Sequence, residues 1–297
     1  MGFYEKMAVV ILMLAMIPML AGCQVKITED DPDQNVRKSL WEEAQDKIDP
    51  DAPPDSAPDH FERALYFLAN DRLDQAHIQF SLAIEKDPEH AGAHNGLGYS
   101  YTNLYGDLVM ANYHWEQALK FNPDRDVSLG AHLGLGVVYC KRGLRRQHEE
   151  ENPELLMERY NPDQVKLLRS SEEYFNLSQS HLKQVLKYDP KSREVFYEYG
   201  TLSMARGEYE MAMQYYRKYL GLHGPGDNLA IRRAYEGMAV AQEGQGKLFE
   251  AIASLKQALK VIPEARSSEM ADRDRLRITL EIDRLERRIL EGDRSGN

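Results

Sequence analysis

The feature that most constrains this chain is a recurring spacing of small residues between residues 57 and 290. Five small residues are each followed, 12 positions later, by a proline or a glycine. The five pairs are Ala76–Pro88, Ala111–Pro123, Ser178–Pro190, Ala212–Gly224 and Ala251–Pro263. A small residue lets two helices cross closely, and a bulky neighbour fills the space beside it. Proline ends a helix because it pushes the preceding residue out of the α region. The spacing therefore predicts tandem pairs of antiparallel helices.

A second regular spacing separates the small residue of the first helix from that of the second helix in each pair. The step between their small residues is 12 in repeats one, four and five, 13 in repeat two and 42 in repeat three. Repeat three therefore carries a 30-residue insertion, placed at about residues 144–170. Within it, Glu154 to Tyr160 predicts a short helix between two Asn-Pro turn signals. The insertion could be a docking flap for a partner, or it could extend the flanking helices while its opposed charges pair with each other.

The residues at these positions resemble those of a known repeat family. Leu97-Gly98 with Tyr101, then Ala111 with Trp115, then Pro123, resemble the tetratricopeptide pattern L-G-x2-Y…A-x3-F…P. The resemblance covers Ala57 to about Leu290. It implies an all-α fold, a right-handed α-solenoid of about five helix pairs. The pairs are expected at about residues 57–90, 91–125, 129–192, 193–226 and 232–265.

A stack of repeats needs a cap at its end. Residues 267–291 predict a C-terminal capping helix, because Ile278, Ile282, Leu285 and Ile289 recur at helical spacing with charged residues between them. Residues 292–297 are expected to be a short tail.

The amino-terminal residues predict an export signal. Ala8 to Leu20 is an apolar run of 13 residues that is interrupted only by a proline. It is shorter than the roughly 20 apolar residues that cross a bilayer. Leu20-Ala21-Gly22-Cys23 resembles the lipobox of bacterial lipoproteins. This resemblance implies a cleaved signal peptide at residues 1–22, acyl chains on Cys23 and, from Gln24, a place in the outer membrane facing the periplasm. The alternative is an uncleaved anchor that keeps the domain in the cytoplasm.

Residues 23–56 predict a lipid-anchored tether, since acidic residues and prolines oppose compaction. The whole chain carries 37 basic and 48 acidic side chains, a formal net charge of −11. This balance argues against a nucleic-acid partner. The two cysteines exclude a four-cysteine zinc site. His90 and His94 have a metal-compatible spacing, but no acidic residue completes the set, so neither a metal nor a cofactor is expected.

In the tetratricopeptide family the first helices of the pairs line a concave groove. The register transfers this role to Leu65, Asn95, Tyr99, Asn103, Val137, Tyr197, Thr201 and Met204. The same register adds Phe61, Leu68, Leu133, Cys140, Glu236, Val240 and Glu243. These positions are mostly apolar or amide-bearing, which suits an extended peptide or a helix of a protein partner. The alternative is that several of them pack against the insertion.

Together, lipobox and repeats predict a membrane-anchored scaffold or adaptor that binds another protein and is not an enzyme. The chain resembles tetratricopeptide lipoproteins that act as pilus secretin pilots or as adaptors for envelope proteases and murein enzymes. The alternative is an enzyme whose site forms between the 144–170 insertion and the groove.

Overall fold

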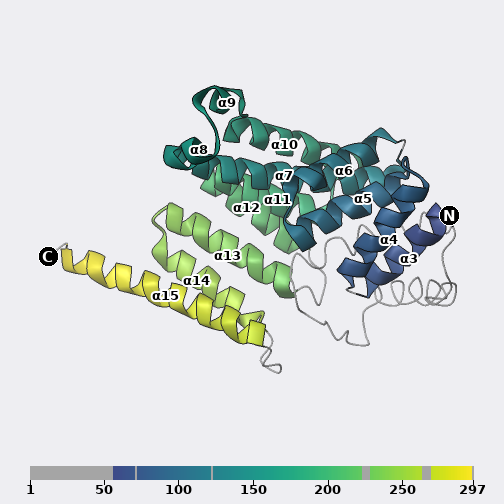
Figure 1. Cartoon of the computed structure of the whole chain (residues 1–297). Helices are drawn as coiled ribbons and strands as arrows, with labels where there is room; N and C mark the ends of the chain where they lie inside the picture. Colours follow the sequence, from purple (N-terminus) through teal and green to yellow (C-terminus); the bar gives the residue numbers. More distant parts are fainter. Residues whose placement is uncertain (1–55, 71, 122, 223–227, 263–268, 296–297) are drawn as a thin grey trace, which may run out of the picture. The chain divides into compact units, whose positions relative to one another are not determined.

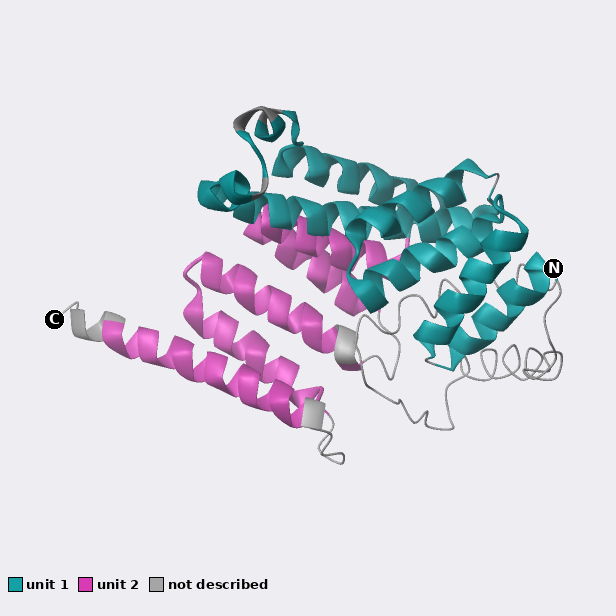
Figure 2. Ribbon diagram, viewed as in Figure 1, with its two compact units in different colours: residues 1–190 teal, residues 191–297 magenta. Residues whose placement is uncertain are grey.

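The computed structural model describes residues 56–70, 72–121, 123–222, 228–262 and 269–295, and these are helices joined by short turns (Figure 1). No described residue lies in a β-strand. The chain divides into two compact units, residues 1–190 and 191–297 (Figure 2). The predicted all-α fold of tandem helix pairs is confirmed.

The described part of the first unit contains three helix pairs that pack in chain order. They are α3 (Ala57–Ala69) with α4 (Leu73–Lys86), α5 (Ala91–Ser100) with α6 (Leu108–Lys120), and α7 (Arg125–Glu151) with α10 (Ser171–Tyr188). Several of these helices have a side-chain cap at the N-terminus. Ser56 and Ser170 each form a reciprocal capping box, and Asp107 and Asp124 accept hydrogen bonds from backbone N–H groups. These caps satisfy amide groups that a helix start leaves unpaired.

Two glycines make room for one aromatic ring where helices of neighbouring pairs pack together. Trp115 of α6 lies between Gly98 of α5 and Gly134 of α7. A Cβ atom added at Gly134 would come within 2.2 Å of the Trp115 ring, and one at Gly98 within 2.7 Å. The two glycines therefore create the space for the indole, which is 4% exposed.

A π-helix interrupts the second pair. Segment η1 (Tyr101–Tyr105) continues α5 and ends at Gly106, whose φ of +65° is left-handed. A π-turn accommodates one extra residue in a helix. Repeat two has the one-residue-longer step between its small residues, 13 against 12. The extra residue is therefore absorbed as a π-turn at the end of the first helix.

The insertion lengthens repeat three rather than forming a separate body. Helix α7 runs on through its first residues to Glu151, and two short helices follow, α8 (Pro153–Arg159) and α9 (Pro162–Leu167). Helix α10 then returns along α7 (Figure 1). The insertion thus extends the flanking helices, one of the two outcomes considered from the sequence.

Among the residues that the structure describes, the second unit contains two helix pairs and a further helix. These are α11 (Arg193–Ala205) with α12 (Tyr209–Gly221), α13 (Asn228–Gly244) with α14 (Leu248–Lys260), and α15 (Glu269–Ser295). Helix α15 buries Ile278, Ile282 and Leu285 in an apolar cluster with α14. It thereby covers the apolar face of the last pair.

Ion pairs also join α15 to α13. Arg277 donates to both carboxylate oxygens of Glu236 at 2.9 Å, and Arg284 donates to Glu243 at 2.6 Å. The guanidinium of Arg232, which is 6% exposed, pairs with Asp274. Because Arg232 is buried, the ion pair with Asp274 compensates a charge that would be costly alone.

Candidate protein-binding surface

The groove positions predicted in the first unit are mostly buried. Leu65, Asn95, Tyr99 and Val137 are only 4%, 5%, 7% and 8% exposed. Phe61, Leu68 and Cys140 are buried as well. These side chains belong to the packing of the helix pairs and present little surface.

Asn95 has a structural partner in the second pair. Its Oδ1 accepts a hydrogen bond of 3.0 Å from the indole N–H of Trp115. Its side chain also lies close to Gly130 of α7. Asn95 therefore positions the ring around which α5, α6 and α7 pack. The half-buried Asn103 donates from Nδ2 to the carbonyl of Tyr99 at 2.8 Å, inside the π-turn region.

In the second unit, the predicted positions on α11 are half-buried, and Tyr197 and Met204 pack against the core of this unit. Tyr197, Thr201 and Met204 are four and three residues apart, so they share one helix face. Thr201 donates from Oγ1 to the Tyr197 carbonyl. The Tyr197 ring packs at 5.8 and 5.5 Å from the rings of Tyr216 and Tyr219. Burial is the main cause that raises the pKa of Tyr197 to about 12, so the phenol stays protonated and can donate a hydrogen bond.

The neighbouring first helix, α13, adds an exposed apolar residue. Val240 is 54% exposed and lies between Glu236 and Glu243, which are held by arginines of α15. Hydrogen bonding from Arg284 is the main cause that lowers the pKa of Glu243. Helices α11 and α13 contact each other. We call Tyr197, Thr201, Met204 and Val240 the α11–α13 surface; it is the most accessible part of the predicted groove.

Four exposed apolar residues near the turn between α5 and α6 were not anticipated from the sequence. Leu104, Tyr105, Val109 and Tyr113 are 39%, 57%, 67% and 48% exposed, and they lie on η1 and the first turns of α6. The extra residue of repeat two could have indicated this exposure. A π-turn accommodates the extra residue and rotates the residues after it out of the helical register.

Histidines join the two helices of each pair in the first unit at one repeated position. The contacts are His60–Gln79 at 2.8 Å, His94–His114 at 3.0 Å and His132–His181 at 2.9 Å, each through Nδ1 of a histidine. The first member lies four residues before the small residue of the first helix, and the second lies three after that of the second helix. Aligning the repeats on their small residues would have revealed these pairs.

The hydrogen bonds of His94 fix its tautomer. Its Nε2 lies 3.0 Å from the carbonyl of Pro88, which can only accept, so Nε2 carries the proton. Nδ1 of His94 therefore accepts, and Nδ1 of His114 donates to it. Burial, followed by the neighbouring histidines, lowers the pKa of His114 to about 4; burial and His132 do the same for His181. Both pairs are neutral at pH 7. His94, considered above with His90 for a metal, is thus part of a helix–helix contact.

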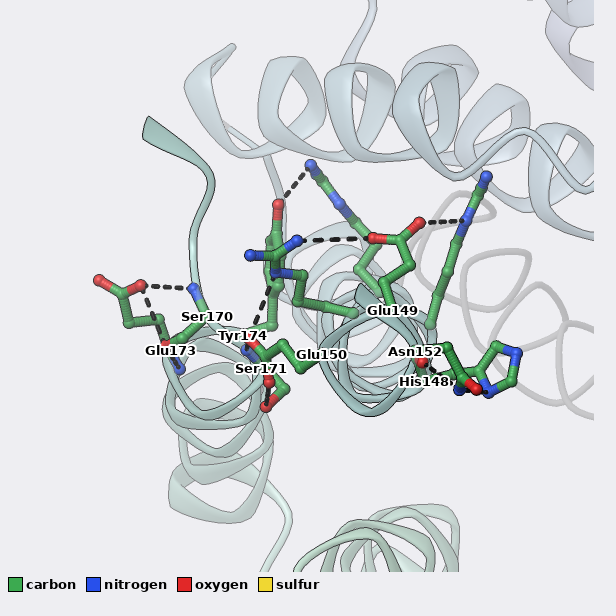
Figure 3. A network of polar contacts seen from close by, with 11 residues as sticks. His148, Glu149, Glu150, Asn152, Ser170, Ser171, Glu173 and Tyr174 are labelled. Carbon is green, nitrogen blue, oxygen red and sulfur yellow. Dashed lines mark hydrogen bonds and ion pairs between the residues drawn. The ribbon is translucent and has the colours of Figure 1, made fainter. Parts of the chain in front are cut away.

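The charged residues at the start of the insertion form a structural network (Figure 3). The buried Arg146 pairs with Glu149 and Glu150 at 3.7 and 3.2 Å. Glu150 accepts hydrogen bonds from the backbone N–H and hydroxyl of Ser171, at the start of α10. Arg142 of α7 donates to the Tyr174 hydroxyl of α10 at 3.0 Å. The network fastens the end of α7 to the start of α10.

Two further findings concern the described part of the chain only. It contains no group of three or more histidine, cysteine, aspartate or glutamate residues arranged to hold a metal ion. None of its helices has the length and apolar character needed to cross a membrane. The lipobox, Cys23 and the tether lie outside the described residues.

Comparison with known families supports the repeat assignment. The tetratricopeptide repeat model matches residues 164–227, which include the end of repeat three and all of α11 and α12. A search of curated proteins finds no match. The chain therefore contains a tetratricopeptide-type segment within a fold of tandem helix pairs.

Solved structures show the same fold at low identity. TTC0263, a thermophilic TPR protein of Thermus thermophilus, is 18% identical with a TM-score of 0.53, covering 76% of this chain and 100% of that one. PilW, a widely conserved type IV pilus biogenesis factor, is 17% identical with a TM-score of 0.51, covering 81% and 93%. A chain of the APC/C hetero-tetramer Cut9–Hcn1 is 14% identical with a TM-score of 0.52, covering 85% and 41%. These likenesses define a tetratricopeptide-type helical fold.

Proposed function

We propose that this protein is a membrane-anchored scaffold that holds a protein partner at the bacterial cell envelope. The observation that carries the proposal is the α11–α13 surface. Two adjacent first helices carry the half-buried Tyr197, Thr201 and Met204 and the exposed Val240 at positions that line the groove in the family. Tandem helix pairs make a rigid frame for such a surface.

The chemistry of this surface suits an extended peptide or an amphipathic helix. Met204 and Val240 supply apolar contact, and the adaptable thioether of Met204 suits a variable partner. The protonated phenol of Tyr197 and the hydroxyl of Thr201 can bond to a partner backbone. Glu236 and Glu243 already accept hydrogen bonds from arginines of α15, so they compete less with Tyr197 and Thr201 for the backbone groups of a partner.

The membrane anchor in this proposal is lipid on Cys23. The sequence Leu20-Ala21-Gly22-Cys23 supports this anchor, and residues 24–56 would be the tether between the lipid and the helical repeats. Two or three acyl chains anchor stably where a single chain does not. The proposed setting is the outer membrane facing the periplasm, in envelope assembly or complex biogenesis of the kind served by secretin pilots and by protease or murein-enzyme adaptors.

Cys23→Ser tests the anchor. We expect the variant to leave the membrane fraction while its helix content, measured by circular dichroism, stays unchanged. The mature wild-type protein should begin at an acylated Cys23 in mass spectrometry. An intact Met1 terminus, with the variant still in membranes, would instead support an uncleaved anchor.

A pair of matched variants tests the surface. Val240→Arg places a charge within the α11–α13 surface, whereas Phe249→Arg changes a residue that is 72% exposed on α14. We expect the first to lower recovery of co-purified envelope proteins at least about 10-fold, since a guanidinium would have to lose its water in place of the apolar contact that Val240 offers. The second should leave recovery unchanged. Equal recovery with both variants would remove the α11–α13 surface from the proposal.

A further inference from the structure

Helix α15 presents a second row of residues beside the seam that packs on α14. Its buried seam consists of Ile278, Ile282 and Leu285, and the partly buried Ile289 packs against it. Leu276, Leu280 and Leu290 are instead 61%, 55% and 61% exposed. A helix that only caps a stack would place polar residues there. Three exposed leucines in one row of a capping helix require a separate explanation.

The exposed row has the spacing of a coiled-coil seam. Leu276, Leu280, Asp283, Arg287 and Leu290 follow one another at steps of four, three, four and three residues. This is the alternation of a and d positions in a heptad. The last three positions, together with Glu286, line a shallow surface hollow. The face therefore has the residue spacing of one half of a two-helix contact.

Four of the five positions of this row, those from Leu280 to Leu290, are complementary to themselves in one orientation. In an antiparallel pair each a position lies opposite a d position of the other helix. Placing Leu280 opposite Leu290 of a second copy also places Asp283 opposite its Arg287, and both contacts occur twice by symmetry. A shift of one heptad would oppose Leu280 to Asp283, and a parallel pair would oppose Asp283 to Asp283. The charges therefore select one register.

We propose that α15 mediates self-association by packing antiparallel on α15 of a second copy, with Leu280 against Leu290 and Asp283 against Arg287. This inference does not depend on the function proposed above. One helix pair buries less than a standard interface, so we expect a dissociation constant on the order of 10–100 μM. Anchoring on one membrane would raise the effective concentration of the two copies.

Charge-reversal variants test the register directly. Asp283→Arg leaves two arginines facing each other, and Arg287→Asp leaves two aspartates. Each should raise the dissociation constant at least about 10-fold, since opposed like charges cost several kcal/mol. The double variant exchanges the two charges and should associate like the wild type. A mixture of the two single variants should form heterodimers, because every arginine then faces an aspartate.

The measurement is sedimentation equilibrium of the full chain in a density-matched nonionic detergent. Glu85→Arg, at an exposed position of α4, is the control for a change of charge alone and should associate normally. Leu280→Ala with Leu290→Ala should weaken association without involving charge. Circular dichroism checks that every variant is folded. A wild type that stays monomeric at about 200 μM, or single variants that do not recover on mixing, would overturn the proposal.

Discussion

Mild acid is expected to destabilise the first unit through its two histidine–histidine contacts. His114 and His181 have pKa values of about 4 in the folded chain, against 6.5 for an ordinary histidine. The unfolded chain therefore takes up protons between pH 6.5 and 4 that the folded chain does not. The free energy of unfolding must fall as the pH decreases through this range, and the contribution of the neutral pairs is complete above pH 6.5.

The size of the effect follows from these pKa values. A difference between 6.5 and about 4 corresponds to about 3 kcal/mol for one fully buried histidine. Solvent reduces this for the half-buried His181, and Asp87 near His94 and Glu116 near His181 favour protonation. We therefore expect a total loss of about 2–4 kcal/mol between pH 7 and pH 4.5.

Repeat one supplies the matched control. There the same position is occupied by His60 and Gln79, a hydrogen-bonded pair with only one titratable member. His114→Gln with His181→Gln should keep the contacts and lose most of the acid dependence. The assay is urea unfolding at pH 7, 5.5 and 4.5, followed by the fluorescence of Trp115 in a Trp41→Phe background. An equal loss in the variant and the wild type would refute the role of the pairs.

Four further substitutions have defined expected results. Gly134→Ala should destabilise the chain by about 1–3 kcal/mol in urea unfolding, because the new methyl group would collide with Trp115. Gly221→Ala meets no atom within 4 Å and should stabilise by about 0.5–1 kcal/mol; the same sign for both would contradict this packing account. Asn95→Ala leaves the Trp115 N–H without its acceptor and should cost about 1–3 kcal/mol, whereas an unchanged urea midpoint would deny Asn95 a structural role. Arg146→Met should loosen the start of α10, seen as faster hydrogen exchange there; unchanged exchange would mean that the network in Figure 3 is dispensable.

The helix pairs could be predicted from the sequence because their spacing records a local geometric requirement. A small residue at each crossing and a proline at each helix end leave a signal that does not depend on distant contacts. Gly98 and Gly134 are examples, since each makes room for Trp115. The extra residue of repeat two was also visible, although its outcome as a π-turn was not.

The exposure of the groove positions could not be predicted in the same way. The register assigns both Asn95 and Thr201 to the groove, yet Asn95 is 5% exposed and bonded to Trp115, while Thr201 is half-buried. The difference depends on which bulky side chain the next helix contributes. That contact joins Asn95 of the first helix to Trp115 of the second, and the register of the first helices alone does not record it.

The most direct test of the scaffold proposal is site-specific photo-crosslinking in cells that make the full chain. A photoreactive amino acid at Thr201 or Met204 lies on the α11–α13 surface, and one at the exposed Glu85 of α4 lies outside it. The proposal predicts the same discrete protein adduct from both surface positions and its absence at Glu85. No adduct from either surface position, or the same adduct from all three, would contradict it.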